Sequence, residues 1–264
     1  MIDKRRFVCA LTALAISAAQ PAHSAASSAL SGSYSFDVTW SLFPELKLAS
    51  GTAQLVEVDG GYEMRLSAQA RLTVPAVDWR GEFAVRGEGD LGDGLPLRFE
   101  RRSTRPDLQT AVVVEWSEPG APPITDTFVL PAGYTIKRDP VDPAKIVDVL
   151  DPLSFMAHIM GEVERTNGES CDLTATTWDG VRLATIEIST VESVPSTRTD
   201  CQVIYRSIDG LRSDSPWRAE EASTRRILRF ERKGLRWEPQ FFRIEGVFLG
   251  YTSTFTTNIT PLDR

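Results

Sequence analysis

Residues 151–163, DPLSFMAHIMGEV, form the strongest helix signal in a sequence that is otherwise patterned as strands. Asp151 is a favourable N-cap, because its carboxylate can accept hydrogen bonds from the free backbone N–H groups of the first turn. Pro152 suits the first helical position, where no N–H is needed. Apolar residues then recur at helical spacing and predict an amphipathic helix over 151–163; they are Leu153, Phe155, Met156, Ile159, Met160 and Val163.

A helix of this length is only marginally stable in water, so it has to pack against an apolar surface. The rest of the chain can supply that surface, because apolar and polar residues alternate along most of it, as in half-buried strands. The expected strands are 33–42, 52–58, 62–74, 79–85, 95–103, 109–116, 124–130, 171–178, 181–190, 201–208, 211 onward, 224–233, 235–248 and 249–259. About a dozen strands exceed what a flat open sheet holds. The sequence therefore predicts a mainly β fold: a curled antiparallel sheet, a β-spiral or incomplete barrel, wrapped around one apolar helix.

The segment 137–151 breaks the strand pattern at Asp139-Pro140 and Asp142-Pro143. We expect a short helical turn over 144–150 that leads into the main helix. Its acidic residues lack the central Gly and closing Glu of a calcium-binding loop, so caps and turns are their expected role.

The first 24 residues have the features of a secretory signal peptide. Lys4, Arg5 and Arg6 precede a short apolar run, and Ala22 and Ser24 suit cleavage before Ala25, with cleavage before Ser27 as the alternative. The run is too short for a spanning helix, which needs about 20 apolar residues. We expect export to the periplasm, one domain over 25–264, and no membrane-spanning segment.

Charge and motifs exclude several functions. The chain carries 29 basic and 36 acidic residues; removing residues 1–24 leaves 26 and 35, a net charge of −9, which argues against nucleic acid as a partner. Phosphate-binding, dinucleotide-binding and serine-hydrolase motifs are absent from the sequence. His158 is the only histidine after residue 24, and it should lie at the rim or face solvent, away from the main apolar stripe. We therefore expect no metal, no cofactor and no catalytic residue.

The two cysteines that follow the signal segment, Cys171 and Cys201, are expected to form a disulfide, because an even pair in an exported protein is typical of one. A redox role would favour a closer spacing of the two. The basic cluster of Arg98, Arg101, Arg102 and Arg105 has two interpretations: contact with an anionic lipid headgroup, or a solvated strand face.

Short motifs in a definite order carry a resemblance to known proteins: Asp93-Gly94-Leu95-Pro96, then DPLS at 151–154, then WDGVR at 178–182, then Cys201 and the Ile208-Asp209-Gly210 turn. This order resembles a bacterial exported β-rich family of unknown function. It is similar to the envelope-integrity β-spiral proteins and, more distantly, to the periplasmic lipoprotein-localisation carriers. The resemblance implies a periplasmic location, a curled sheet around a helix and no known catalysis. In a carrier, the helix would act as a lid or internal plug.

Our leading hypothesis is a non-enzymatic periplasmic protein that supports the cell envelope by binding a lipid-like ligand, a lipoprotein or an envelope protein in the concave sheet. Leu153, Phe155, Met156 and Met160 are the candidate ligand contacts. One alternative is a structural or interaction module with a solid core. Another is a hydrolase that uses two carboxylates brought together by the fold.

Overall fold

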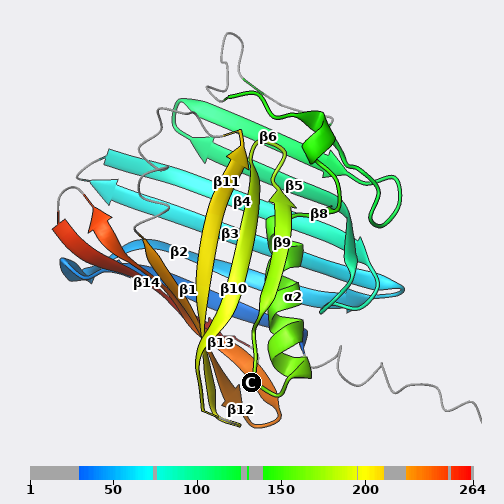
Figure 1. Ribbon diagram of the computed structural model, residues 1–264. Helices are drawn as coiled ribbons and strands as arrows, with labels where there is room; N and C mark the ends of the chain where they lie inside the picture. Colours follow the sequence, from blue (N-terminus) through cyan, green and yellow to red (C-terminus); the bar gives the residue numbers. More distant parts are fainter. Residues whose placement is uncertain are drawn as a thin grey trace, which may run out of the picture.

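The computed structural model describes residues 30–73, 76–125, 130, 139–194, 196–210, 224–248 and 251–262 (Figure 1). Its strands form one 14-stranded sheet, in the order β7-β6-β5-β4-β3-β2-β1-β14-β13-β12-β11-β10-β9-β8. The first half comprises β1 (Gly32–Trp40), β2 (Phe43–Val58), β3 (Gly61–Thr73), β4 (Ala76–Glu88), β5 (Leu95–Arg105), β6 (Leu108–Glu115) and β7 (Ile124–Thr125). The second half comprises β8 (Val149–Leu150), β9 (Leu173–Trp178), β10 (Leu183–Val194), β11 (Arg198–Asp209), β12 (Arg225–Lys233), β13 (Arg236–Phe248) and β14 (Tyr251–Pro261).

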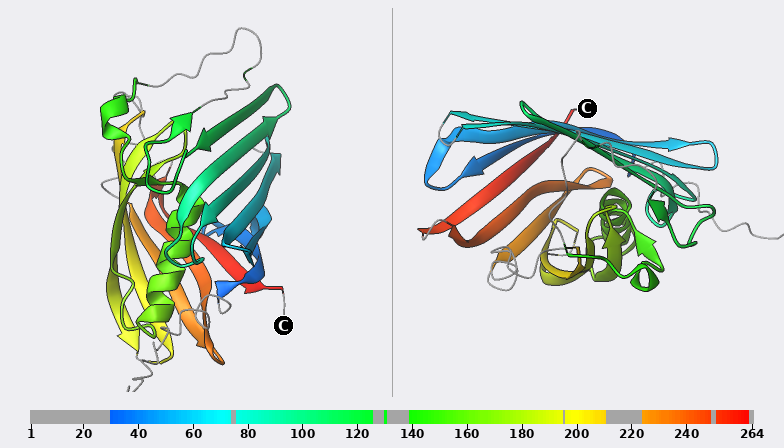
Figure 2. Two further views of the ribbon diagram at one scale, coloured as in Figure 1. Left: turned by 90° about the vertical axis from the view of Figure 1, so that its right-hand side faces the viewer. Right: turned by 90° about the horizontal axis from the view of Figure 1, so that it is seen from above.

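The two halves join through β1 and β14, which are antiparallel neighbours in the middle of the sheet. Figure 2 shows that the sheet bends along this line, so that the two halves face one another. The turn between β9 and β10 reaches the far edge of the first half. There Arg101 Nη1 on β5 lies 2.6 Å from Asp179 Oδ2, and Trp178 Nε1 donates to Thr125 Oγ1 on β7 at 3.0 Å. Among the strands that the structure describes, the sheet order is linear, so the edges are brought together here by side chains and not by a closing strand ladder.

Helix α2 (Pro152–Arg165) lies between the two halves, as the view from above in Figure 2 shows. It contacts β4 of the first half and β9 and β13 of the second. Asp151 is the N-cap, and its carboxylate accepts from the backbone N–H groups of Leu153 and Ser154. The helix ends at Asn167-Gly168, where both residues have positive φ and Gly168 N–H donates to Val163 O at 2.8 Å.

The core is one cluster that joins the helix to both halves of the sheet. Tyr62, Met64, Val85 and Phe99 line its first-half side, and Trp178, Leu183, Ile188, Leu228, Phe230 and Trp237 line its second-half side. The helix contributes Leu153, Phe155, Ala157, Ile159, Met160 and Val163. Each large apolar side chain buried here stabilises the fold by about 1.5–3 kcal/mol, which explains how a helix too short to persist alone is held.

The curled sheet around one helix confirms the fold class expected from the sequence. Two details differ. The described strands include β8, which is not among the expected strands. The expected helical turn over 144–150 is wrong: a 3-10 turn, η1 (Pro143–Lys145), is followed by strand β8, because Asp142 caps a turn that lasts only three residues. The expected strand 124–130 is described at β7, while its residues 126–129 and the start of the expected strand from Leu211, residues 211–223, lie outside the described residues.

The expected signal segment, residues 1–24, lies outside the described residues. Within the described part of the chain, no helix is long and apolar enough to cross a membrane.

Gly161 tests how tightly the helix is held. A Cβ at Gly161 would lie 2.5 Å from Gly92 Cα in the β4–β5 turn, closer than real Cβ contacts allow. Alanine favours a helix over glycine by about 1 kcal/mol, yet we expect Gly161→Ala to lower the free energy of unfolding by about 1–3 kcal/mol through this collision. Urea denaturation measures the effect. Met156→Ala, on an exposed part of the same helix, serves as the control; equal stability of Gly161→Ala and wild type would contradict the packing described here.

Candidate functional site

The face of helix α2 that meets the first half is polar and small. Ser154, His158 and Gly161 follow one another at helical spacing along this face. The hydroxyl groups of Ser154 and Tyr62 on β3 lie 2.7 Å apart, and His158 Nε2 lies 2.8 Å from the backbone oxygen of Gly94. Gly161 allows the backbone of Gly92 to approach. These three residues therefore seat the helix on β3 and the β4–β5 turn.

Asp151 is the buried charge of this contact. Its side chain is fully buried and accepts from the Ser154 hydroxyl and from the backbone N–H groups of Leu153 and Ser154. Burial raises the pKa of Asp151 to about 6, although hydrogen bonds from Ser154 and Leu153 oppose the shift. Burial also raises the pKa of the Tyr62 hydroxyl. The acid, the two hydroxyls and the Gly94 oxygen form a continuous network between helix and sheet.

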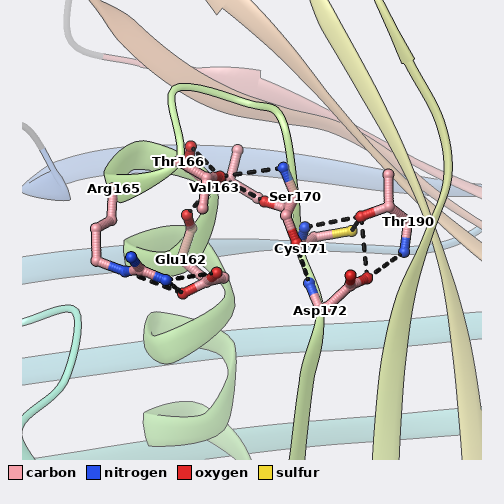
Figure 3. Close-up of polar contacts among 8 residues, drawn as sticks. All are labelled: Glu162, Val163, Arg165, Thr166, Ser170, Cys171, Asp172 and Thr190. Atoms are coloured by element: carbon pink, nitrogen blue, oxygen red, sulfur yellow. Dashed lines mark hydrogen bonds and ion pairs between the residues drawn. The ribbon is translucent and has the colours of Figure 1, made fainter.

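The C-terminal end of the helix is fixed by a second network, shown in Figure 3. Thr166 Oγ1 accepts from Ser170 N–H at 3.2 Å and lies 2.7 Å from Ser170 O. Asp172 Oδ1 then accepts from the backbone N–H of Thr190 at 2.7 Å and from its hydroxyl at 3.0 Å, and these hydrogen bonds with Thr190 are the main cause that lowers the pKa of Asp172. The network ties the segment after the helix to β10.

The disulfide expected from the cysteine count is present: Cys171 is bonded to Cys201 on β11, with Cα atoms 6.3 Å apart. Both residues are fully buried. Cys171 N–H also donates to Thr190 Oγ1 at 3.0 Å, inside the network of Figure 3. The disulfide therefore attaches the segment that follows the helix to the middle of the second half of the sheet.

The concave face continues beyond the helix as a partly exposed apolar surface. We call it the open apolar face. Its side chains point to the same side as the core, yet they are only half buried and lie outside the core cluster; they are Phe36, Val38, Trp40, Trp79, Ile244 and Phe255. The rings of Trp40 and Phe255 stack with centroids 5.4 Å apart. Large apolar side chains in a filled core would be buried, so the described residues do not fill this part of the concave side.

Small residues lie beside these rings. Strands β2, β3 and β4 place Ala49, Gly51, Ala68, Ala70 and Gly81 on the same side of the sheet. A Cβ on Gly51 would meet the Phe36 ring at 2.3 Å, and one on Gly81 would meet the Trp79 ring at 2.5 Å. The two aromatic rings thus lie across the glycines. The two rings and the small residues around them form a shallow apolar surface, which we call the floor of the open apolar face.

The candidate ligand contacts on the helix have different places. Leu153, Phe155 and Met160 are buried in the core cluster. Met156 is 36% exposed, so the predicted apolar stripe is wrong at this residue. At 100° per residue Met156 lies between Val163 and Met160, which are both buried, so helical spacing does not account for its exposure. The open apolar face lies on the concave side of the sheet, where the sequence analysis places a ligand, but the four candidate contacts include none of its residues.

His158 is half buried and bonded to Gly94 O, so the expectation of a solvent-facing histidine is wrong, while the rim position holds. Its ring is engaged because the β4–β5 turn packs on that side of the helix. Among the described residues, no group of three potential metal ligands is present.

The basic cluster divides between the two faces of β5. Arg101 points inward and pairs with Asp179. Arg98 and Arg102 point outward, where they pair with Glu100 and Glu115. A hollow of about 360 Å³ on this outer face has charged residues of both signs in its lining, among them Arg65 and Glu82. This arrangement favours the solvated strand face over a headgroup site.

Comparisons with known proteins give a limited result. No family model matches the sequence, and no curated protein matches it. Among solved structures, the fold is similar to that of a beta-barrel-like protein of a domain of unknown function, DUF1849, from Brucella abortus, with a TM-score of 0.44 and 10% sequence identity over 89% of this chain and 99% of that one. The resemblance to envelope-integrity proteins and lipoprotein carriers stays a prediction.

The buried acid predicts a pH-dependent stability. Because the pKa of Asp151 is raised to about 6 in the fold, its contribution is fully present below about pH 4 and is lost as pH rises through about 6. Relative to Asp151→Asn, whose amide stays neutral, wild type should gain roughly 2–3 kcal/mol on going from pH 7 to pH 4. Urea denaturation of both proteins across this range measures the difference. A difference that does not vary with pH would refute the assignment.

The disulfide closes a loop with a sequence separation of 30 residues. We expect its reduction to lower the free energy of unfolding by about 3–4 kcal/mol. Urea titrations with and without dithiothreitol measure the loss. The double variant Cys171→Ala with Cys201→Ala should be as unstable as the reduced protein and insensitive to the reductant. Equal midpoints for oxidised and reduced wild type would contradict this role.

Proposed function

We propose that the protein is a non-enzymatic, exported protein of the bacterial periplasm that binds an apolar, lipid-like ligand on the open apolar face and thereby supports the cell envelope. The main observation that supports this proposal is that six large apolar side chains point into the concave side and remain half buried. Leaving such a surface against water costs free energy, about 25 cal/mol for each Å². An apolar ligand lying on the floor would recover that free energy.

The shape of the floor supports a flat or extended ligand. Phe36 and Trp79 lie across glycines, and Ala49, Ala68 and Ala70 add little height. Ser103 on β5 neighbours Gly81 and bonds to Trp79 Nε1 through its hydroxyl at 2.8 Å, which fixes the ring. Such sites bind by apolar contact with few polar groups, which suits acyl chains better than sugars or nucleotides.

The non-enzymatic part of the proposal rests on how the reactive side chains are used. Asp151, Ser154, His158 and Tyr62 include the types that serve in hydrolases, but here each holds the helix to the sheet. The buried Asp200 is engaged as well, in a two-point contact with Arg229 at 2.6 and 2.7 Å. These groups have structural partners that a reaction would have to displace.

The exported location is supported by the signal-like residues 1–24 and by the disulfide, which persists in oxidising compartments. In such a compartment, apolar molecules need a protein to shield them from water. The helix is an internal plug in this proposal: its buried residues fill one end of the concave side and leave the other end for the ligand.

Two variants at neighbouring positions test the binding site. Ala68 points inward between Gly51 and Gly81, and Ser67 points outward from the same strand. Ala68→Trp fills the space above the floor, so lipid recovered with the purified protein should fall at least tenfold; Ser67→Trp should leave it unchanged. Mass spectrometry of solvent extracts measures the lipid, and thermal unfolding confirms that both variants fold.

Two results would overturn the proposal. One is wild-type protein that carries no lipid and takes up none from vesicles; this would favour the interaction module with a solid core. The other is an equal lipid content in Ala68→Trp and wild type, which would place the ligand elsewhere on the molecule.

A further inference from the structure

Strands β12, β13, β14 and β1 place four inward side chains in one row across the open end of the concave side. Arg226 on β12 pairs with Ile244, and Ile244 pairs with Phe255. Phe255 in turn pairs with Trp40 on β1. We call these four residues the cross-sheet row. Paired residues of neighbouring strands point to the same side of a sheet, so the row leads from the open apolar face to a guanidinium group.

Arg226 lies at the border between the core and the open apolar face. The register of β12 and β13 is regular from Arg225 to Arg229, so Arg226 points to the same side as Leu228. Leu228 is buried in the core cluster, whereas Arg226 is only partly buried. Arg226 Nη1 donates to the backbone oxygen of Thr224 at 3.3 Å. The guanidinium therefore extends along β12 away from Leu228 and the helix.

The carboxylates around this region point elsewhere. Glu245 lies on the outer face, where it pairs with Arg225 at 3.6 Å and with Arg243 at 3.7 Å. The inward Asp179 pairs with Arg101 at the far edge of the sheet. Neither the cross-sheet row nor the inward rows of described residues on either side of it contain a carboxylate. Those rows consist of Leu228, Phe242, Thr257 and Val38 on one side, and of Gly246 and Ser253 on the other.

We propose that the ligand of the open apolar face is an amphiphile with an anionic head group, a carboxylate or a phosphate, and that Arg226 binds this head group. The inference rests on the ligand site proposed above and specifies the class of its ligand. The head group lies at β12, and the acyl chain follows the cross-sheet row toward β1.

The chemistry of the guanidinium selects this class of ligand. Its N–H donors form a planar pair that matches two oxygens of a carboxylate or a phosphate. A cationic head group would be repelled, and the attraction for an anionic one is stronger where the site is partly shielded from water. Apolar ligand sites use a few such polar groups to fix the orientation of the ligand.

Three probes that share a dodecyl chain test the head-group preference: dodecanoate, dodecyl phosphate and dodecanol. The chain length suits the row, because β12 and β1 are three strand spacings apart, roughly 14 Å along the sheet. Equilibrium dialysis against the purified, delipidated protein, with mass spectrometry of both compartments, measures the three dissociation constants. At least one anionic probe should bind about tenfold more tightly than dodecanol, because charged groups form the stronger hydrogen bonds. The anionic probe that binds more tightly identifies the head group as a carboxylate or a phosphate.

Variants at two adjacent positions test the role of Arg226. Arg226→Gln should lower the affinity for the anionic probes to that for dodecanol, and it should leave the affinity for dodecanol unchanged. Arg226→Lys keeps the positive charge and should retain part of the preference. Arg225→Gln is the matched control, since Arg225 points outward and pairs with Glu245; it should bind all three probes as wild type does. Thermal unfolding checks that each variant folds.

The results separate this inference from the proposal on which it rests. Equal binding of the three probes by wild type, or a preference that persists in Arg226→Gln, would overturn the role of Arg226 and leave the apolar site in place. If Arg226→Gln does not fold, the preference of wild type and its partial retention in Arg226→Lys decide the question. Ala68→Trp should weaken all three probes alike, and no binding of any probe to wild type would overturn both the apolar site and this inference.

Discussion

The structure depends on the seating of one short helix between two halves of a single sheet. The first half meets the helix through Ser154, His158 and Gly161, which is a polar and closely spaced contact. The second half meets it through apolar side chains and is fastened by the disulfide beyond its end. Without the helix, the two halves would face each other across an apolar gap that neither could fill, and the bend at β1 and β14 would have nothing to close on.

The same seating explains why an apolar surface stays open. A helix of 14 residues is shorter than the long strands it crosses, so it covers only one end of the concave side. At the other end, strands β2, β3 and β4 offer small residues, and the aromatic rings of Phe36 and Trp79 lie flat on them. The proposed binding surface is therefore the part of the concave side that the helix does not cover. Its composition is that of a core, and its partial exposure is what distinguishes it.

Several features could be read from residues directly. The N-cap Asp151, Pro152 at the first helical position and the Asn167-Gly168 stop define the helix because each acts on its own backbone. The turns at Asp59-Gly60 and Asp179-Gly180 separate strands for the same reason. The single apolar stripe wrongly included Met156 among the buried positions, although Met160 and Val163 on either side of it around the helix are buried; the sequence does not show which positions of the stripe the sheet leaves uncovered. The contact of His158 with the backbone oxygen of Gly94 could not be predicted in the same way, since the two residues are 64 positions apart in the chain.

The period-two strands, the capped helix and the cysteine pair follow from local sequence, because hydrogen-bonding turns, caps and side-chain alternation act over a few residues. Tertiary structure alone decided which inward positions are buried and which stay open: Tyr62 and Phe36 share the same alternating pattern, yet only the first lies under the helix. It also decided that Arg101 turns inward to Asp179 while Arg98 and Arg102 stay at the surface. These outcomes depend on where the sheet bends and how far the helix extends, and both are set by contacts between residues far apart in the chain.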